Sequence, residues 1–359
     1  MADTAILRIE AAGDAFTIGQ TLGRAAASDI RERSFATAEF KTLGARWRGS
    51  DYLGQLEAAA RKAYPEFMRE IEGIADGAGV DFESIFMWNC RGDLRLPDDA
   101  SALDHARAAD GCTTIMIPAT NEAPAVIAHN EDGAPELLGH CFWFSARPEN
   151  GPAFESFMYP GMLAGHTLGL NAAGIVQTIN NIRVHDLKPG IPRHIVCRAV
   201  LATTNMADAL AVLGRGDRAG GFHHNLGSAK EGRLSSVEAP ASGCQVRAID
   251  EAPSAHANHL VAAQFSSLDQ EVTGSSRDRQ TAADNWVRTR PPRSSADAEA
   301  ILFERDTPIY RANDAGDDYS QTLCTGVFEL FADRVDWRIH AAPTERAAID
   351  GTSLVRLDA

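Results

Sequence analysis

The pattern of apolar residues changes character at residue 112, and this change constrains the fold more than any other feature. A strand pattern at residues 5–10 is followed by helical patterns over residues 13–42 and 51–76. Residues 97–110 lack periodicity and indicate an exposed linker. From residue 112 onward, short apolar runs between tight turns indicate strands. Helices followed by a long antiparallel run predict an α+β fold or a layered α/β sandwich.

Local signals refine this outline. Gly79 is expected to end the second helical stretch, Asp81 to cap a further helix, and Pro192 to begin a two-part helix. Residues 171–174 fit a hairpin turn, and residues 266–296 indicate helix and loop. Strands are predicted at residues 115–118, 125–129, 141–146, 153–158, 165–170, 175–180, 222–228, 233–238 and 244–249, with a final hairpin over 322–330 and 336–340.

Composition excludes several classes of protein. With 359 residues, 44% hydrophobic and 23% charged, the chain has the profile of a soluble globular protein. A net charge of −15 argues against a nucleic-acid partner. The start of the chain lacks a signal-peptide pattern, and no apolar run approaches the ~20 residues that span a bilayer. We therefore expect a cytoplasmic protein without a membrane partner, and homo-oligomerisation stays open.

The six cysteines are scattered, without a CxxC pair, so they predict neither a zinc site nor a disulfide framework. His223 and His224 are adjacent in a predicted strand and would point to opposite faces. His256 and His259 lack a carboxylate or thiol at ligand spacing. We expect no metal and no cofactor.

The bond between Gly111 and Cys112 lies where the helical part meets the strands. It could mark a domain boundary or a processing site inside one fold. Gly111 lacks a Cβ and tolerates strained conformations, so the Cys112 sulfur could attack its carbonyl carbon. The acyl group would move from nitrogen to sulfur, and water would hydrolyse the thioester. Cys112 would then carry a thiol and a free α-amine, and an α-amine with a pKa of roughly 7.7–8.0 can serve as its base.

Short motifs, each weak alone, occur along most of the chain. They are Asp110-Gly111-Cys112-Thr113-Thr114, Asn130-Glu131-Asp132, Gly169–Gly174 with Asn180, Ala257-Asn258-His259, Ile309–Ala312 and the leader's Asn89-Cys90-Arg91. In order and spacing this set resembles the acyl-coenzyme A:6-aminopenicillanic acid acyltransferase family. The resemblance implies an N-terminal-nucleophile hydrolase fold, which is a four-layer αββα sandwich over residues 1–359. It also implies a precursor that cuts itself into an α chain (1–111) and a β chain (112–359).

The same resemblance gives roles to single residues. Asp132 would hold the new α-amine, and Arg311 would place positive charge near the thiolate and Asp132. Asn258 would donate an N–H to the oxyanion, with Asn180 as a second oxyanion candidate. The alternatives are a turn aspartate, turn asparagines and a solvated surface arginine. Glu131 stands where the family has an aromatic residue, so we expect a different pocket wall there.

We therefore expect a self-processing cysteine amidohydrolase that cleaves small N-acyl amides through a thioester at Cys112. The first alternative is an acyltransferase that moves an acyl group from a thioester or amide donor to an amine. A penicillin V acylase or bile-salt-hydrolase-like amidase is a second, although the long leader favours the acyltransferase branch. A catalytically silent binding protein and a papain-like enzyme with a histidine base are further alternatives.

Overall fold

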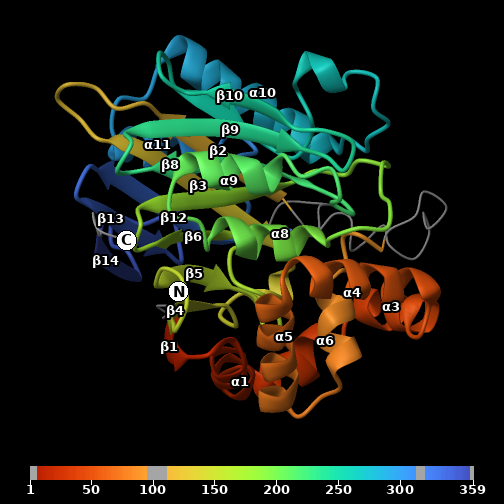
Figure 1. Cartoon of the computed structure of the whole chain (residues 1–359). Helices are drawn as coiled ribbons and strands as arrows, with labels where there is room; N and C mark the ends of the chain where they lie inside the picture. The colour runs from red at the N-terminus through yellow and green to blue at the C-terminus, as the bar shows by residue number, and fades with distance from the viewer. Residues whose placement is uncertain (1–5, 95–110, 313–319, 356–359) are drawn as a thin grey trace.

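Two β-sheets and flanking helices make up the computed structural model, which describes residues 6–94, 111–312 and 320–355 (Figure 1). The linker predicted at residues 97–110 lies outside the described residues. The α+β class is confirmed. The N-terminal elements are β1 (Leu7–Gly13), α1 (Ala15–Ala25), α2 (Ala27–Asp29), the π-helical turn η1 (Ile30–Ser34), α3 (Ala38–Trp47), α4 (Asp51–Ala63), α5 (Pro65–Ala78) and α6 (Phe82–Asn89).

The first sheet has the strand order β1-β4-β5-β6-β7-β8-β9-β10. All neighbours are antiparallel except β1 and β4, which run parallel and join the N-terminal segment to the rest of the chain. Its later strands are β4 (Phe142–Pro148), β5 (Phe154–Met158), β6 (Leu168–Asn171), β7 (Ile175–Asn181), β8 (Phe222–Ser228), β9 (Arg233–Ala239) and β10 (Gln245–Ala248).

The second sheet is antiparallel throughout, with the order β11-β2-β3-β12-β13-β14. The final hairpin predicted from the sequence is therefore incomplete, because β14 adds a further strand beside β13. The strands are β2 (Gly111–Ile117), β3 (Ala125–Gly133), β11 (Ser254–His256), β12 (Gln321–Phe331), β13 (Arg334–His340) and β14 (Ile349–Leu354).

Helices cover the outer faces of both sheets. α8 (Arg193–Val200), which is followed by α9 (Met206–Leu213), packs Cys197 against Ile179 and Phe222 of the first sheet. α10 (Gly274–Thr289) and α11 (Ser295–Leu302) bury Ala283 and Leu302 on the second sheet. Short 3₁₀ turns occur at η2 (Pro135–Leu137) and η3 (Ala263–Phe265).

The two sheets face each other across an apolar core. Trp143 of β4 and Trp337 of β13 have ring centroids 4.5 Å apart, so the aromatic strand predicted at residues 141–146 serves the core. Along β2, Met116 belongs to this core while Ile115 and Ile117 pack under α10 and α11. This alternation is the ordinary two-residue period of a strand and decides which side chains reach the site.

Several helix boundaries follow the sequence signals. The Asp81 side chain accepts a hydrogen bond from the Ser84 N–H at the start of α6. Gly79 ends α5 with a φ of +66°, in the left-handed region that glycine adopts without strain. Pro65 is the first residue of α5 and separates it from α4. The single helix expected over residues 13–42 is instead divided into α1, α2, η1 and α3.

α1 and α5 touch backbone to backbone. Gly19 and Gly23 of α1 face α5, and Gly73 and Gly77 of α5 face α1. A Cβ built on Gly19 would lie 2.0 Å from the carbonyl oxygen of Glu70. No residue other than glycine fits at this crossing without moving one helix.

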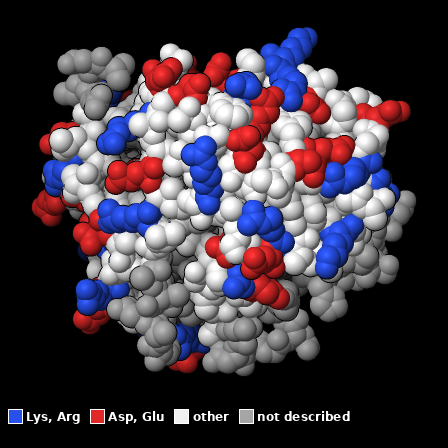
Figure 2. Space-filling view, turned by 90° about the horizontal axis from the view of Figure 1, so that it is seen from below, with Lys and Arg blue, Asp and Glu red and all other residues white. Residues whose placement is uncertain are grey.

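The N-terminal helices are joined to the rest of the chain by a buried ion pair. Arg198 of α8 donates to Glu70 of α5 at 3.0 Å, and both side chains are almost fully enclosed. One apolar cluster also runs from the N-terminal helices into both sheets. On the face seen from below, acidic and basic side chains are interspersed rather than gathered in one patch (Figure 2).

Candidate active site

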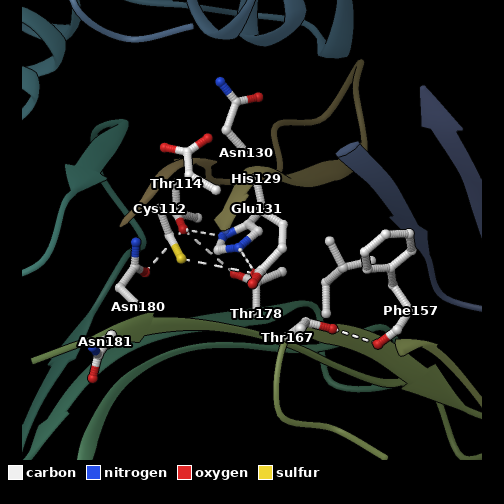
Figure 3. A network of polar contacts seen from close by, with 12 residues as sticks. Cys112, Thr114, His129, Asn130, Glu131, Phe157, Thr167, Thr178, Asn180 and Asn181 are labelled. Atoms are coloured by element: carbon white, nitrogen blue, oxygen red, sulfur yellow. Dashed lines mark hydrogen bonds and ion pairs between the residues drawn. The ribbon is translucent and has the colours of Figure 1, made fainter. Parts of the chain in front are cut away.

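The site is built on the pairing of β2 with β3. Cys112 lies opposite Glu131, Thr114 opposite His129, and Gly111 opposite Asp132. The strand period places the first two pairs on the face toward the first sheet, where they form one polar network (Figure 3). Asn130 points to the other side, where its amide donates to the Leu302 carbonyl at 2.8 Å.

Cys112 is buried and engaged through three of its atoms. Its N–H donates to Oδ1 of Asn258 at 2.8 Å, and its carbonyl accepts from the Arg279 guanidinium. Its thiol donates to Oε2 of Glu131 at 3.8 Å. Burial, followed by the charges of Glu131 and Asp132, raises the pKa of the thiol well above its ordinary value. Cys112 is therefore a protonated thiol in the uncut chain.

Glu131 is the centre of the network. The Tyr159 hydroxyl donates to its Oε1 at 2.5 Å, and His129 Nε2 lies 3.1 Å from its Oε2. Thr114 Oγ1 lies 2.7 Å from His129 Nδ1. Burial lowers the pKa of His129 to about 3, so the imidazole is neutral and has one N–H. Thr114 Oγ1 also donates to Asn180 Oδ1 at 3.0 Å and accepts from Asn225 Nδ2 at 3.0 Å, so it joins the imidazole to both asparagines.

The ligand-type atoms of Cys112, His129 and Glu131 lie within 4.8 Å of one another, which is close enough to hold a metal ion. These three residues were not considered together in the sequence analysis, because their proximity depends on the pairing of β2 with β3.

Asp132 faces the bond between Gly111 and Cys112. Its Oδ1 accepts from the Thr322 hydroxyl at 2.7 Å, while its buried Oδ2 accepts no hydrogen bond from the described residues. A Cβ on Gly111 would lie only 3.3 Å from Oδ2. Burial raises the pKa of Asp132 to about 6, against the opposing charges of Arg279 and Arg311. Oδ2 is thus placed where a new N-terminal amine at residue 112 would need an acceptor.

Asn258 is brought to Cys112 as expected, but in a different orientation. Its Oδ1 accepts from the Cys112 N–H, and its Nδ2 donates to the Asn181 carbonyl at 3.0 Å. The N–H predicted for an oxyanion is therefore occupied in the uncut chain. Asn180 also lies near the site, yet its amide donates to the His256 carbonyl at 3.2 Å.

Arg311 lies on the Asp132 side of the sheet rather than beside the sulfur. Its guanidinium donates to Ser275 Oγ and to the Ser320 carbonyl, and its charge reaches Asp132. The cation that contacts Cys112 is Arg279, which the sequence analysis missed.

A helical period within residues 266–296, the segment predicted as helix and loop, could have indicated Arg279. Ser276, Arg279 and Gln280 share one face of α10, three or four residues apart. Ser276 Oγ accepts from the Asn258 N–H at 2.9 Å, and Gln280 Oε1 accepts from the Ala257 N–H at 2.7 Å. Arg279 Nη2 donates to Asn258 Oδ1 at 2.7 Å. This face of α10 fixes the asparagine that holds Cys112.

The thiol adjoins a small cavity with about 350 Å³ of empty volume, open solvent included. Arg91 of the N-terminal segment forms part of its wall, together with Tyr159 and Arg193 from later in the chain. Arg193 is fixed by a 2.9 Å hydrogen bond to Asn181 Oδ1. Both sides of the predicted cleavage point therefore shape the space beside Cys112.

Comparison with known proteins agrees with the resemblance found in the motifs. The sequence profile of the family described as acyl-coenzyme A:6-aminopenicillanic acid acyl-transferase matches residues 119–343. The chain is 28% identical over 317 residues to the beta-alanyl-dopamine/carcinine hydrolase of Drosophila melanogaster, covering 79% of each protein.

The chain is also 27% identical over 261 residues to the 40 kDa form of acyl-coenzyme A:6-aminopenicillanic-acid-acyltransferase from Emericella nidulans. That match covers 71% of this chain and 70% of the fungal protein. In the part of the chain that the structure describes, no helix is both long and apolar enough to traverse a bilayer.

Proposed function

Because the chain belongs to the acyl-coenzyme A:6-aminopenicillanic acid acyl-transferase family, we propose that it is a self-processing cysteine amidohydrolase with Cys112 as its nucleophile. The bond between Gly111 and Cys112 breaks, leaving an α chain of residues 1–111 and a β chain of residues 112–359. The observation that carries this proposal is the position of Asp132 Oδ2, which lies against Gly111 and lacks a hydrogen-bond donor among the described residues.

The fold supports the proposal at the level of layers. Outer helices α8 and α9, two facing sheets, and outer helices α10 and α11 correspond to the αββα order of an N-terminal-nucleophile hydrolase. The nucleophile of such an enzyme begins a buried strand, as Cys112 does near the start of β2.

The mature site follows from small changes to the uncut one. The nitrogen of Cys112 already donates to Asn258 Oδ1. As a free amine it gains further hydrogens, one of which can reach Asp132 Oδ2. Two acceptors then fix the direction of the nitrogen lone pair toward the sulfur, so that the amine takes the thiol proton.

Turnover then proceeds through a thioester. The thiolate attacks the substrate carbonyl, the amine is released with a proton from the α-ammonium group, and water hydrolyses the acyl-enzyme. In this scheme the main role of Asn258 is to orient the α-amine. Its predicted oxyanion role requires Nδ2 to leave the Asn181 carbonyl, and Asn180 would have to leave the His256 carbonyl in the same way.

Small N-acyl amides are the proposed substrates, and β-alanyl amides are the first probes because of the name of the Drosophila relative. Acyl transfer to an amine is the second candidate, favoured by the name of the Emericella relative. The two differ in whether water or an acceptor amine resolves the thioester.

Intact-mass analysis and N-terminal sequencing of the purified protein test the proposal. We expect two fragments, one beginning with Cys112, whose masses sum to the full chain plus one water. Cys112→Ala should remain a single chain, whereas Cys141→Ala, which alters another buried free cysteine, should be cut normally. A wild-type chain that stays whole and still hydrolyses amides would reject self-processing, and a cut chain without turnover would favour a silent binding protein.

A further inference from the structure

The uncut chain lacks the base that the mature enzyme uses. Before cleavage the nitrogen of Cys112 is an amide that donates its hydrogen to Asn258 Oδ1 at 2.8 Å. Its lone pair is delocalised into the Gly111 carbonyl, so it cannot accept a proton from the sulfur. The first cleavage therefore needs another acceptor for the thiol proton.

We propose that Glu131 is the general base for self-cleavage. This inference rests on the proposed function, because it concerns how the Gly111–Cys112 bond is broken. Oε2 of Glu131 is the side-chain atom to which the Cys112 thiol donates, at 3.8 Å, a hydrogen-bond distance for sulfur (Figure 3). The two residues are direct cross-strand partners in β2 and β3, so the sheet itself sets their separation.

The surroundings of Glu131 suit a proton acceptor. The Tyr159 hydroxyl donates to Oε1 at 2.5 Å and Nε2 of neutral His129 lies 3.1 Å from Oε2, so two uncharged side chains hold the carboxyl group in one orientation. Thr114 in turn fixes the imidazole.

The reaction balances with water as the other reactant. The proton of Sγ moves to Glu131 Oε2 while the sulfur attacks the Gly111 carbonyl carbon. The bond between that carbon and the Cys112 nitrogen breaks, and Glu131 returns the proton to the nitrogen, which becomes the α-amine. One water then hydrolyses the thioester, giving the Gly111 carboxylate and the free thiol.

Asp132 is the other carboxylate close to the bond, and the structure separates the two. Asp132 lies opposite Gly111, one residue further along β3, and so faces the opposite side of the sheet from the sulfur. Its Oδ2 is directed at the Gly111 backbone, whereas Glu131 is hydrogen-bonded to the sulfur. Asp132 therefore suits the amine after cleavage, and Glu131 suits the thiol before it.

Cell-free synthesis of the full chain, sampled by intact mass over time and with a chelator present, tests this assignment. We expect Glu131→Gln to slow cleavage by about 10²–10⁴-fold, the usual contribution of a general base. Glu131→Asp, which keeps a carboxylate but withdraws it from the sulfur, should give an intermediate rate. In Glu131→Ala, added formate should restore cleavage in proportion to its concentration.

Glu238 provides a matched control, because it is a second buried glutamate partnered by a histidine, with His256 Nε2 at 3.0 Å. Glu238→Gln should cleave at the wild-type rate. A folded Glu131→Gln chain that cleaves within threefold of wild type would overturn the assignment, as would a block in Asp132→Asn without one in Glu131→Gln. If Glu131→Gln does not fold, a cleavage rate in Glu131→Asp equal to that of the wild type overturns the assignment of Glu131 as the base. A wild-type chain that is never cut would instead reject the proposed function.

Discussion

Replacing Gly19 with alanine tests whether the backbone contact between α1 and α5 holds the N-terminal helices in place. The new Cβ would lie 2.0 Å from the Glu70 carbonyl oxygen, where ordinary contact begins at 3.4 Å. The nearest atoms are all backbone, so no rotamer change can relieve the clash, and the helices must separate by about 1.4 Å.

The expected cost combines two opposing effects. Overpacking costs up to about 3 kcal/mol, and here it also loosens the buried Leu22 and Ile74 around the crossing. The higher helix propensity of alanine returns roughly 0.5–1 kcal/mol. We therefore expect Gly19→Ala to lower the free energy of unfolding by about 2 kcal/mol.

Gly54 is the matched control, since it lies inside α4 with nothing within 4 Å of a new Cβ. Gly54→Ala should raise the free energy of unfolding by roughly 0.5–1 kcal/mol. Both substitutions are made in the Cys112→Ala background, so that every protein compared is a single intact chain. Unfolding by urea is followed by circular dichroism. If Gly19→Ala is as stable as Gly54→Ala, the reasoning from the close contact is refuted.

Two further substitutions probe buried charges. Burial raises the pKa of Asp93 to about 7, above its ordinary 3.8. Between these two values the folded chain holds a proton that the unfolded chain releases, so the free energy of unfolding falls as pH rises toward 7. Between pH 5 and pH 8, Asp93→Asn should remove about 3 kcal/mol of this fall in the free energy of unfolding, measured by urea unfolding. If the free energy of unfolding depends on pH in the same way in both chains, the argument is contradicted. Because the Arg279 charge lowers the pKa of Asp132, Arg279→Gln should move the acid limb of the turnover profile to higher pH. The exposed Arg277→Gln is its control, and equal profiles for the two variants would exclude the effect.

The sequence predicted strands such as β7, β8 and β9, but it set the end of β3 too early. β3 was expected to end at residue 129 but continues to Gly133. Asn130, Glu131 and Asp132 resemble a turn in a linear pattern, yet β2 and β12 pair with them on both sides. Their hydrogen-bond partners come from distant segments, which a local pattern does not contain.

Sequence motifs indicate which residues belong to the site, but not how their side chains are oriented. Asn258 was predicted to donate to an oxyanion, and the structure brings it to the Cys112 N–H, where the direction of its amide depends on Arg279 and on the Asn181 carbonyl. β11 has only three residues, too few for a periodic signal, and α11 lies in a stretch without a strong apolar stripe. Long-range contacts decide each of these features.

The wall that Arg91 contributes to the cavity has a consequence for assembly. If the chain is cut before Cys112, residues 6–94 remain bound through the β1–β4 pairing and the enclosed Glu70–Arg198 bridge. The leader would then persist as a permanent subunit, not a discarded propeptide. Translation of both subunits from one message as one polypeptide guarantees equal numbers of each, and neither half would need to find its partner by diffusion.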